Sequence, residues 1–183
     1  MFNINSDSID FIKVKASDHK KNKQRILLEI SKLQRKYVTE DFEGDYTSYI
    51  SNTDWNFKEK NINWFEFSLS QKDKHKVLDK IYNKSKLDNV QITDAWFNQY
   101  YPNSGSDHPF HIHDNVNFSG IYYIELESKE LRTVFLNPKN NKEIVANVSE
   151  GDILIFDGNI PHKSPRNFTN SVKTVLAFNF KTF

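Results

Sequence analysis

Two histidines separated by a single residue are the part of this sequence best suited to chemistry. They are His111 and His113, and a third histidine, His162, follows much later in the chain. Residues two apart in a β-strand project from the same face, so both imidazoles of the pair can reach one point. Neutral imidazole binds Fe, Zn, Cu or Ni, and three protein ligands leave coordination positions open for water or substrate. The three histidines therefore predict a mononuclear metal site, although the pair alone is also compatible with a structural or solvated role.

Composition narrows the kinds of site that this chain can build. It contains no cysteine, which excludes disulfides, thiolate ligands, iron–sulfur clusters and a cysteine nucleophile. The net charge is only +1 over 183 residues, so bulk electrostatics give no case for nucleic-acid binding. No stretch approaches the roughly 20 apolar residues that a membrane span needs. We expect a soluble, intracellular (cytoplasmic) protein that does not bind a membrane, and the sequence leaves its oligomeric state open.

The second half of the chain predicts a β-rich structure that would carry these histidines. Short runs rich in β-branched and aromatic residues alternate with turn-forming residues such as Asn, Asp, Gly and Pro. The runs that suit strands are 91–101, 119–125, 131–136, 142–148, 152–156 and 171–180. Several strands at this spacing are typical of a sandwich, a jelly roll or a barrel.

The first half predicts two amphipathic helices that lie against the sheet. One would begin after Ser17 or Asp18 and run to about Lys36, and the other would be capped by Ser70. Between them, 41–61 is polar and aromatic without clear periodicity, which is typical of a functional loop or lid, although a plain connection fits as well. We expect a single domain over 1–183, with 1–89 as helical support and candidate lid and 90–183 as the metal-binding core.

Several segments, in this order, resemble the 2-oxoglutarate- and Fe(II)-dependent oxygenases, the superfamily that includes the prolyl hydroxylases. The resemblance is greatest to a small branch that carries a His-x-His motif, and more distant to the prolyl hydroxylases. It covers about half of the chain, from 91 to 180. The segments that carry it are Tyr-Pro-Asn-Ser-Gly at 101–105 before the histidine pair, Ser-Gly-Ile-Tyr-Tyr at 119–123, Gly-Asp-Ile-Leu-Ile-Phe at 151–156 before Pro161 and His162, and Lys-Thr-Val-Leu-Ala-Phe-Asn at 173–179.

The resemblance implies a mainly β fold with flanking helices, a double-stranded β-helix or jelly roll. It also implies an enzyme, a dioxygenase of the hydroxylase type, that uses Fe(II), 2-oxoglutarate and O2 to oxidise a C–H bond of an unidentified prime substrate. Lys173 occupies the position of the residue that holds the distal carboxylate of 2-oxoglutarate, with Arg166 as the alternative. Other residues expected near the cosubstrate are Tyr101, Tyr123 and Asn98. His108 precedes a proline in an expected loop and receives no role.

Two positions depart from the pattern of the superfamily. The second metal ligand is usually Asp or Glu, whereas this chain has His113 there. Asp114 is the rival ligand, but an odd step from His111 turns it to the other face unless the strand bulges. The carboxylate-binding residue is usually Arg, and Lys173 would replace its bidentate fork by a single point charge.

Two other functions remain open at the level of sequence. One is a cupin-like dioxygenase with three histidine ligands that does not use 2-oxoglutarate. The other is a non-catalytic jelly-roll module whose histidines are incidental or bind structural zinc. The position of Lys173 is the discriminator: if it lies in the pocket near the three histidines, the 2-oxoglutarate enzyme is favoured, and if it lies outside, one of the other two functions is.

Overall fold

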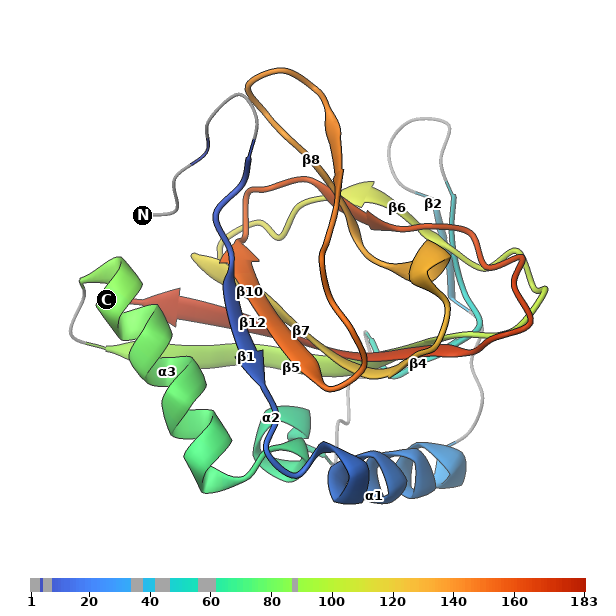
Figure 1. Ribbon diagram of the computed structural model, residues 1–183, viewed down its shortest axis with the longest axis horizontal. Coiled ribbons are helices and arrows are strands. Elements are labelled where there is room, and N and C mark those ends of the chain that lie inside the picture. Colours follow the sequence, from blue (N-terminus) through green and yellow to red (C-terminus); the bar gives the residue numbers. More distant parts are fainter. Residues whose placement is uncertain (1–3, 5–7, 34–37, 42–46, 56–61, 87–88) are drawn as a thin grey trace.

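A six-stranded antiparallel sheet forms the centre of the protein (Figure 1). The computed structural model describes residues 4, 8–33, 38–41, 47–55, 62–86 and 89–183. In spatial order the strands are β1 (Ile12–Lys15), β10 (Asp152–Asp157), β7 (Phe118–Leu126), β12 (Lys173–Thr182), β5 (Val90–Tyr100) and β4 (Asn52–Thr53). The long strands β5, β7 and β12 lie side by side at its middle.

A second sheet of four short antiparallel strands packs against one face of the first. Its order is β6 (His108–His111), β11 (His162–Ser164), β8 (Val134–Leu136) and β9 (Glu143–Val145). A short 3-10 helix, Lys129–Leu131, precedes β8, and β2 (Val38–Asp41) pairs with β3 (Thr47–Ile50) in a separate hairpin. The two facing sheets form a jelly roll, which confirms the predicted fold class.

Three helices cover the other face of the six-stranded sheet (Figure 1). They are α1 (His19–Lys32), α2 (Trp64–Ser68) and α3 (Gln71–Ser85). Ser70 caps α3 as predicted, because its hydroxyl accepts a hydrogen bond from the backbone N–H of Asp73. Asp18 stands at the N-cap of α1 without a side-chain cap hydrogen bond, and α1 ends at Lys32 rather than near Lys36.

Strand alternation divides the apolar residues into two cores. On β7, Tyr122 and Ile124 face the helices, whereas Ile121 and Tyr123 face the second sheet. The helix-side core includes the aromatic cluster of Phe65 against Phe178 and Phe180 on β12. The space between the sheets therefore has its own apolar lining, into which the ends of β6 and β11 deliver the predicted histidines.

The predicted strands are present, with shifted ends. The run 91–101 forms β5 and 171–180 forms β12, whereas only 143–145 of the run 142–148 is a strand. β6 and β11 were not predicted, because each is too short to show a period. Much of the candidate lid, 42–46 and 56–61, lies outside the described residues. Among the described residues, no helix is both long and apolar enough to cross a membrane.

Candidate metal and anion site

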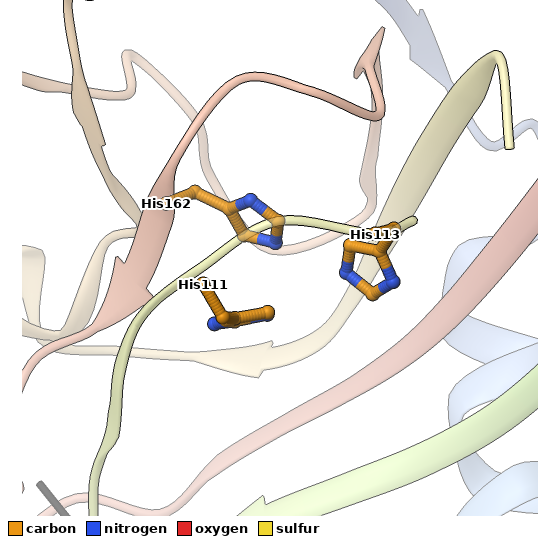
Figure 2. A group of neighbouring side chains, drawn as sticks. All are labelled: His111, His113 and His162. Carbon is orange, nitrogen blue, oxygen red and sulfur yellow. The ribbon is translucent and has the colours of Figure 1, made fainter. Parts of the chain in front are cut away.

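The three predicted histidines meet between the two sheets (Figure 2). His111 ends β6, His162 begins β11, and the two are directly paired across these strands. His113 lies two residues beyond the end of β6. One ligand atom from each imidazole can be chosen so that all three lie within 4.8 Å of one another. Since metal–nitrogen bonds are about 2.1 Å long, the three rings would have to draw closer together to bind one ion.

Backbone carbonyls fix the orientation of two of the rings. Nδ1 of His111 lies 2.8 Å from the carbonyl oxygen of Pro109, and Nδ1 of His162 lies 3.0 Å from that of Ile160. A carbonyl oxygen only accepts hydrogen bonds, so Nδ1 carries the proton in each ring and Nε2 keeps its lone pair. Carbonyl partners of this kind are typical of histidines that bind a metal through the other nitrogen.

Burial keeps all three imidazoles in the form that binds metal. Desolvation, followed by the charge of His113, lowers the pKa of His111 to about 3. Desolvation lowers the pKa of His113 to about 4, and together with the neighbouring histidines it lowers the pKa of His162 well below its usual value. The rings are therefore neutral at physiological pH.

A glycine allows the segment carrying His113 to approach the turn after β10. The backbone N–H of His113 donates to the carbonyl oxygen of Gly158 at 2.9 Å. A Cβ atom on Gly158 would lie 2.8 Å from Cγ2 of Val116 and 3.0 Å from its carbonyl oxygen. The absence of a side chain at Gly158 thus lets His113 lie close to His162 without a strand to hold it.

Lys173 lies in the same cavity as the histidines, which has a volume of about 110 Å³. Its side chain is only 1% exposed, and Nζ donates to the hydroxyl of Ser164 at 2.8 Å and lies 5.3 Å from the centre of the Tyr100 ring. Among the described residues, no carboxylate forms an ion pair with it. Desolvation lowers the pKa of Lys173 to about 7. A buried ammonium without an acidic partner is costly, and an anion entering the cavity would relieve that cost.

The other predicted site residues divide between this cavity and other places. Asn98 lines the cavity and accepts a hydrogen bond from the hydroxyl of Thr53 at 2.7 Å. Tyr123 lies behind the wall, where its hydroxyl donates to Thr133, a lining residue, at 2.8 Å, and burial raises its pKa. Of the candidate cosubstrate contacts, Asn98 thus lines the cavity, whereas Tyr123 lies behind Thr133.

Three candidate residues are not among those that line the cavity: Tyr101, Arg166 and Asp114. Tyr101 lines a separate pocket beside α1, and Arg166 is exposed and forms an ion pair with Asp107 at 3.0 Å. Asp114 is exposed and is not part of the three-histidine group. The geometry therefore favours Lys173 over Arg166 as the cation for an anionic ligand, and His113 over Asp114 as a metal ligand.

Several lining residues were not singled out in the sequence. Trp96 and Tyr100 share the face of β5 with Asn98, so strand alternation alone would have found them. His108 is 6% exposed and lines the cavity, with its ring centre 3.8 Å from that of His111. No local pattern pointed to His108, since its segment was expected to be a loop.

Comparison with known proteins yields matches only at the level of structure. No family model matches the chain, and no curated protein matches it in sequence. A 2OG-Fe(II) oxygenase family oxidoreductase from Burkholderia pseudomallei is similar with a TM-score of 0.62 and 14% identity, over 93% of this chain and 84% of the other. A prolyl-4-hydroxylase from Pseudomonas putida is similar with a TM-score of 0.61 and 13% identity, over 94% and 92% of the two chains.

A third similar structure is that of a carbocyclase and not of a hydroxylase. The non-heme alpha-ketoglutarate-dependent carbocyclase SnoK from nogalamycin biosynthesis has a TM-score of 0.63 and 8% identity, over 93% of this chain and 78% of the other. At these identities the similarity concerns the fold. The chain has the jelly-roll fold of the 2-oxoglutarate- and Fe(II)-dependent oxygenases, with a group of three histidines between its sheets.

Proposed function

We propose that this protein is an Fe(II)- and 2-oxoglutarate-dependent oxygenase that hydroxylates an unidentified prime substrate. The observation that carries the proposal is the buried ammonium of Lys173 in the cavity of the three histidines. A metal site for direct attack on a small molecule needs no such cation, and neither does a structural zinc site. A dicarboxylate that binds the metal at one end and a cation at the other accounts for both the three-histidine group and the buried Lys173.

The donor set fits the metal that this function requires. His111, His113 and His162 would hold Fe(II) through imidazole nitrogens, and imidazole is a suitable ligand for iron. Three protein ligands leave positions for the cosubstrate and O2. When bound, Fe(II) would couple the conversion of 2-oxoglutarate and O2 to succinate and CO2 with insertion of the second oxygen atom into a C–H bond.

The protein's own residues would bind and orient the cosubstrate. The ammonium of Lys173 pairs with the distal carboxylate, and the hydroxyl of Ser164 keeps that ammonium in place. Because an ammonium is a point charge, other groups must orient the carboxylate. Tyr100 and Thr133 line the same cavity and supply hydroxyl groups for this purpose, as does the amide of Asn98.

The apolar walls would protect the reaction from water. Phe135 and Phe156 pack against the ring of His162, with ring centres 5.8 and 4.7 Å away. A dry environment strengthens the ion pair of Lys173 and limits wasteful quenching of reactive species. We also propose that 1–89 supports the core and contributes a lid from 41–61. Of that segment, Trp55 lies at the cavity.

Hydroxylation is the simplest outcome of this chemistry. We include it in the proposal, because the fold by itself does not determine the reaction. A prolyl-4-hydroxylase and a carbocyclase share this fold although their reactions differ. The product therefore depends on the substrate carbon that reacts and on the residues around it. In the proposed reaction, one oxygen atom of O2 enters the new hydroxyl group and the other enters succinate.

Succinate formation tests the proposal directly. The purified chain, loaded with Fe(II) and supplied with ascorbate, 2-oxoglutarate and air, should release succinate even without a prime substrate. Lys173→Met should abolish this release while metal binding persists, and Arg166→Ala should leave it intact. If wild-type protein with confirmed bound iron releases no succinate, the proposal is wrong and the cupin-like alternative gains.

A further inference from the structure

The cavity has a second end, away from Lys173, that the cosubstrate does not explain. On β12, Lys173 pairs with Tyr100 of β5, whereas Ala177 pairs with Trp96. Four residues of strand separate these positions by about 13 Å, at roughly 3.3 Å per residue. His113 belongs to the Trp96 end, since its ring centre lies 5.7 Å from that of Trp96. The histidines therefore stand between a cationic end and an aromatic end.

Stacked aromatic rings form the wall of this second end. The rings of Trp55 and Trp96 are stacked, with centres 6.2 Å apart and planes inclined by 25°. Trp55 also meets His108 edge-on at 5.8 Å. Trp96 is buried and Trp55 is only half-buried, so Trp55 lies nearer to the solvent. The wall thus runs from the opening inward to His113.

The remaining lining of this end is mainly apolar, and the hydroxyl of Ser119, which also lines it, donates to the side chain of Asn179 at 2.9 Å. Ala177 lies beside Trp96, and Ile121 lies beside Ala177 on β7. No acidic side chain is found among the described residues that line the cavity. Lys163 reaches the cavity wall, but its ammonium lies over the ring of Phe110 and pairs with Glu143 at 2.7 Å. A charged group would find no counter-ion here.

We infer that the aromatic wall, defined by Trp55 and Trp96, is the subsite for an uncharged aromatic ring of the prime substrate. A cationic group would be attracted by the indole faces, but the bound metal would repel it, and no carboxylate side chain among the described lining residues would compensate. An anion would have to compete with 2-oxoglutarate for the metal, because the ammonium of Lys163 is already paired with Glu143. A flat uncharged ring can pack against the indole wall and carry a neighbouring C–H bond toward His113.

The cavity, which the ring would share with the cosubstrate, is too small for a large ligand. Sites for drug-sized molecules hold roughly 300–1,000 Å³, whereas this cavity has about 110 Å³. One small group therefore enters, and any remainder of the substrate stays outside beyond Trp55. The inference rests on the proposed function, because it takes the other end of the cavity to be filled by 2-oxoglutarate.

Competition binding tests the subsite without relying on turnover. The whole chain is loaded with Zn(II) and saturated with 2-oxoglutarate, and 4-fluorobenzyl alcohol serves as a reporter whose fluorine resonance broadens on binding. Benzyl alcohol and cyclohexylmethanol, which differ only in the ring, are the neutral competitors, and benzylammonium and benzoate are the charged ones. Benzyl alcohol should displace the reporter at a concentration at least about fivefold lower than each of the others.

Variants locate the binding. Trp96→Leu and Trp55→Leu should each weaken reporter binding at least about fivefold, and Trp55→Phe should retain most of it. Tyr82→Leu, which changes an exposed aromatic residue on α3, is the matched control and should have no effect. Zinc affinity of each variant shows that the histidine group is intact, and Trp55→Leu keeps the test valid if Trp96→Leu does not fold.

Three results would overturn the inference: equal potency of the saturated and aromatic rings, tightest binding of a charged competitor, or unchanged binding in both leucine variants. Reporter binding without succinate formation would leave the subsite in place and remove the proposed oxygenase. Succinate formation without reporter binding would support the proposed oxygenase and overturn the subsite.

Discussion

The Nζ atom of Lys173 lies 2.8 Å from the hydroxyl of Ser164, two residues after His162 on the three-residue strand β11. Residues two apart on a strand share a face, so His162 and Ser164 both point between the sheets. One short strand therefore positions a proposed metal ligand and the group that holds the proposed carboxylate-binding ammonium. The backbone of β11 therefore sets the distance between the proposed metal ligand and the proposed carboxylate-binding group.

Replacing Lys173 should stabilise the protein at neutral and acidic pH. Burial lowers its pKa from 10.5 to about 7, so below pH 7 the folded protein bears the full cost of a buried charge. Between about pH 7 and 10.5 the unfolded chain binds the extra proton, so stability rises with pH and the cost fades. Lys173→Met should raise the melting temperature at pH 6 by about 5 °C or more, and by much less at pH 10, in thermal unfolding scans. A lower melting temperature at pH 6 would show that the ammonium stabilises the fold.

The affinity for 2-oxoglutarate should fall as pH rises. Lys173 is protonated below its pKa of about 7, and above it binding of the dicarboxylate must also take up a proton. The dissociation constant, measured by calorimetry with Zn(II)-loaded protein, should increase up to about tenfold per pH unit above pH 7. Ser164→Ala should weaken binding severalfold, whereas Arg166→Ala should not. A pH-independent affinity from pH 6 to 9 would argue against Lys173 as the carboxylate partner.

Metal binding should depend on His113 and not on its neighbour Asp114. His113 belongs to the three-histidine group, whereas Asp114 is exposed. His113→Ala should lower Zn(II) or Fe(II) affinity by at least about 100-fold, since even loss of an outer partner costs about 10–100-fold. Asp114→Ala is the matched control and should bind as wild type in a chelator competition. The opposite result would make the carboxylate the ligand.

The metal should stay bound to unusually low pH. Ordinary histidines compete with protons below about pH 6.5, but burial lowers the pKa of His111 to about 3 and that of His113 to about 4. Zn(II) affinity should therefore be nearly constant from pH 8 to about 5 and decline only below that. Because of the same pKa shifts, the unfolded chain binds more protons than the folded chain between pH 6.5 and 4. The metal-free protein should therefore become less stable as the pH falls through this range. Metal release with a midpoint near pH 6.5 would show that the rings are solvated.

Gly158→Ala should weaken the metal site from outside it. The added Cβ would lie 2.8 Å from Cγ2 of Val116 and 3.3 Å from the carbonyl oxygen of His113. The segment carrying His113 must then shift, at a cost of about 1–3 kcal/mol in unfolding free energy and about tenfold in metal affinity. Adding Val116→Ala removes the side-chain clash but not the clash with the carbonyl of Val116, so the double variant should recover only part of the loss. Unchanged metal affinity in Gly158→Ala would show that the turn does not position His113.

The long elements of the fold are readable in the sequence because their patterns are local. Runs such as 91–101 and 171–180 carry enough β-branched and aromatic residues to indicate strands, and Ser70 marks the start of α3. The strands β6 and β11 escape prediction, since three or four residues show no period. Their pairing depends on contacts between residues about fifty positions apart.

The sequence by itself determined the chemical inventory: imidazole is available as a ligand, thiolate is not, and a His-x-His pair precedes a third histidine. It also placed Asn98 and Lys173 on strands. Only the tertiary structure decided which cation is buried with the histidines, and that His108 and Trp55 join them. The physical reason is that burial and the register between strands are long-range properties, fixed by how two sheets pack and not by any run of neighbouring residues.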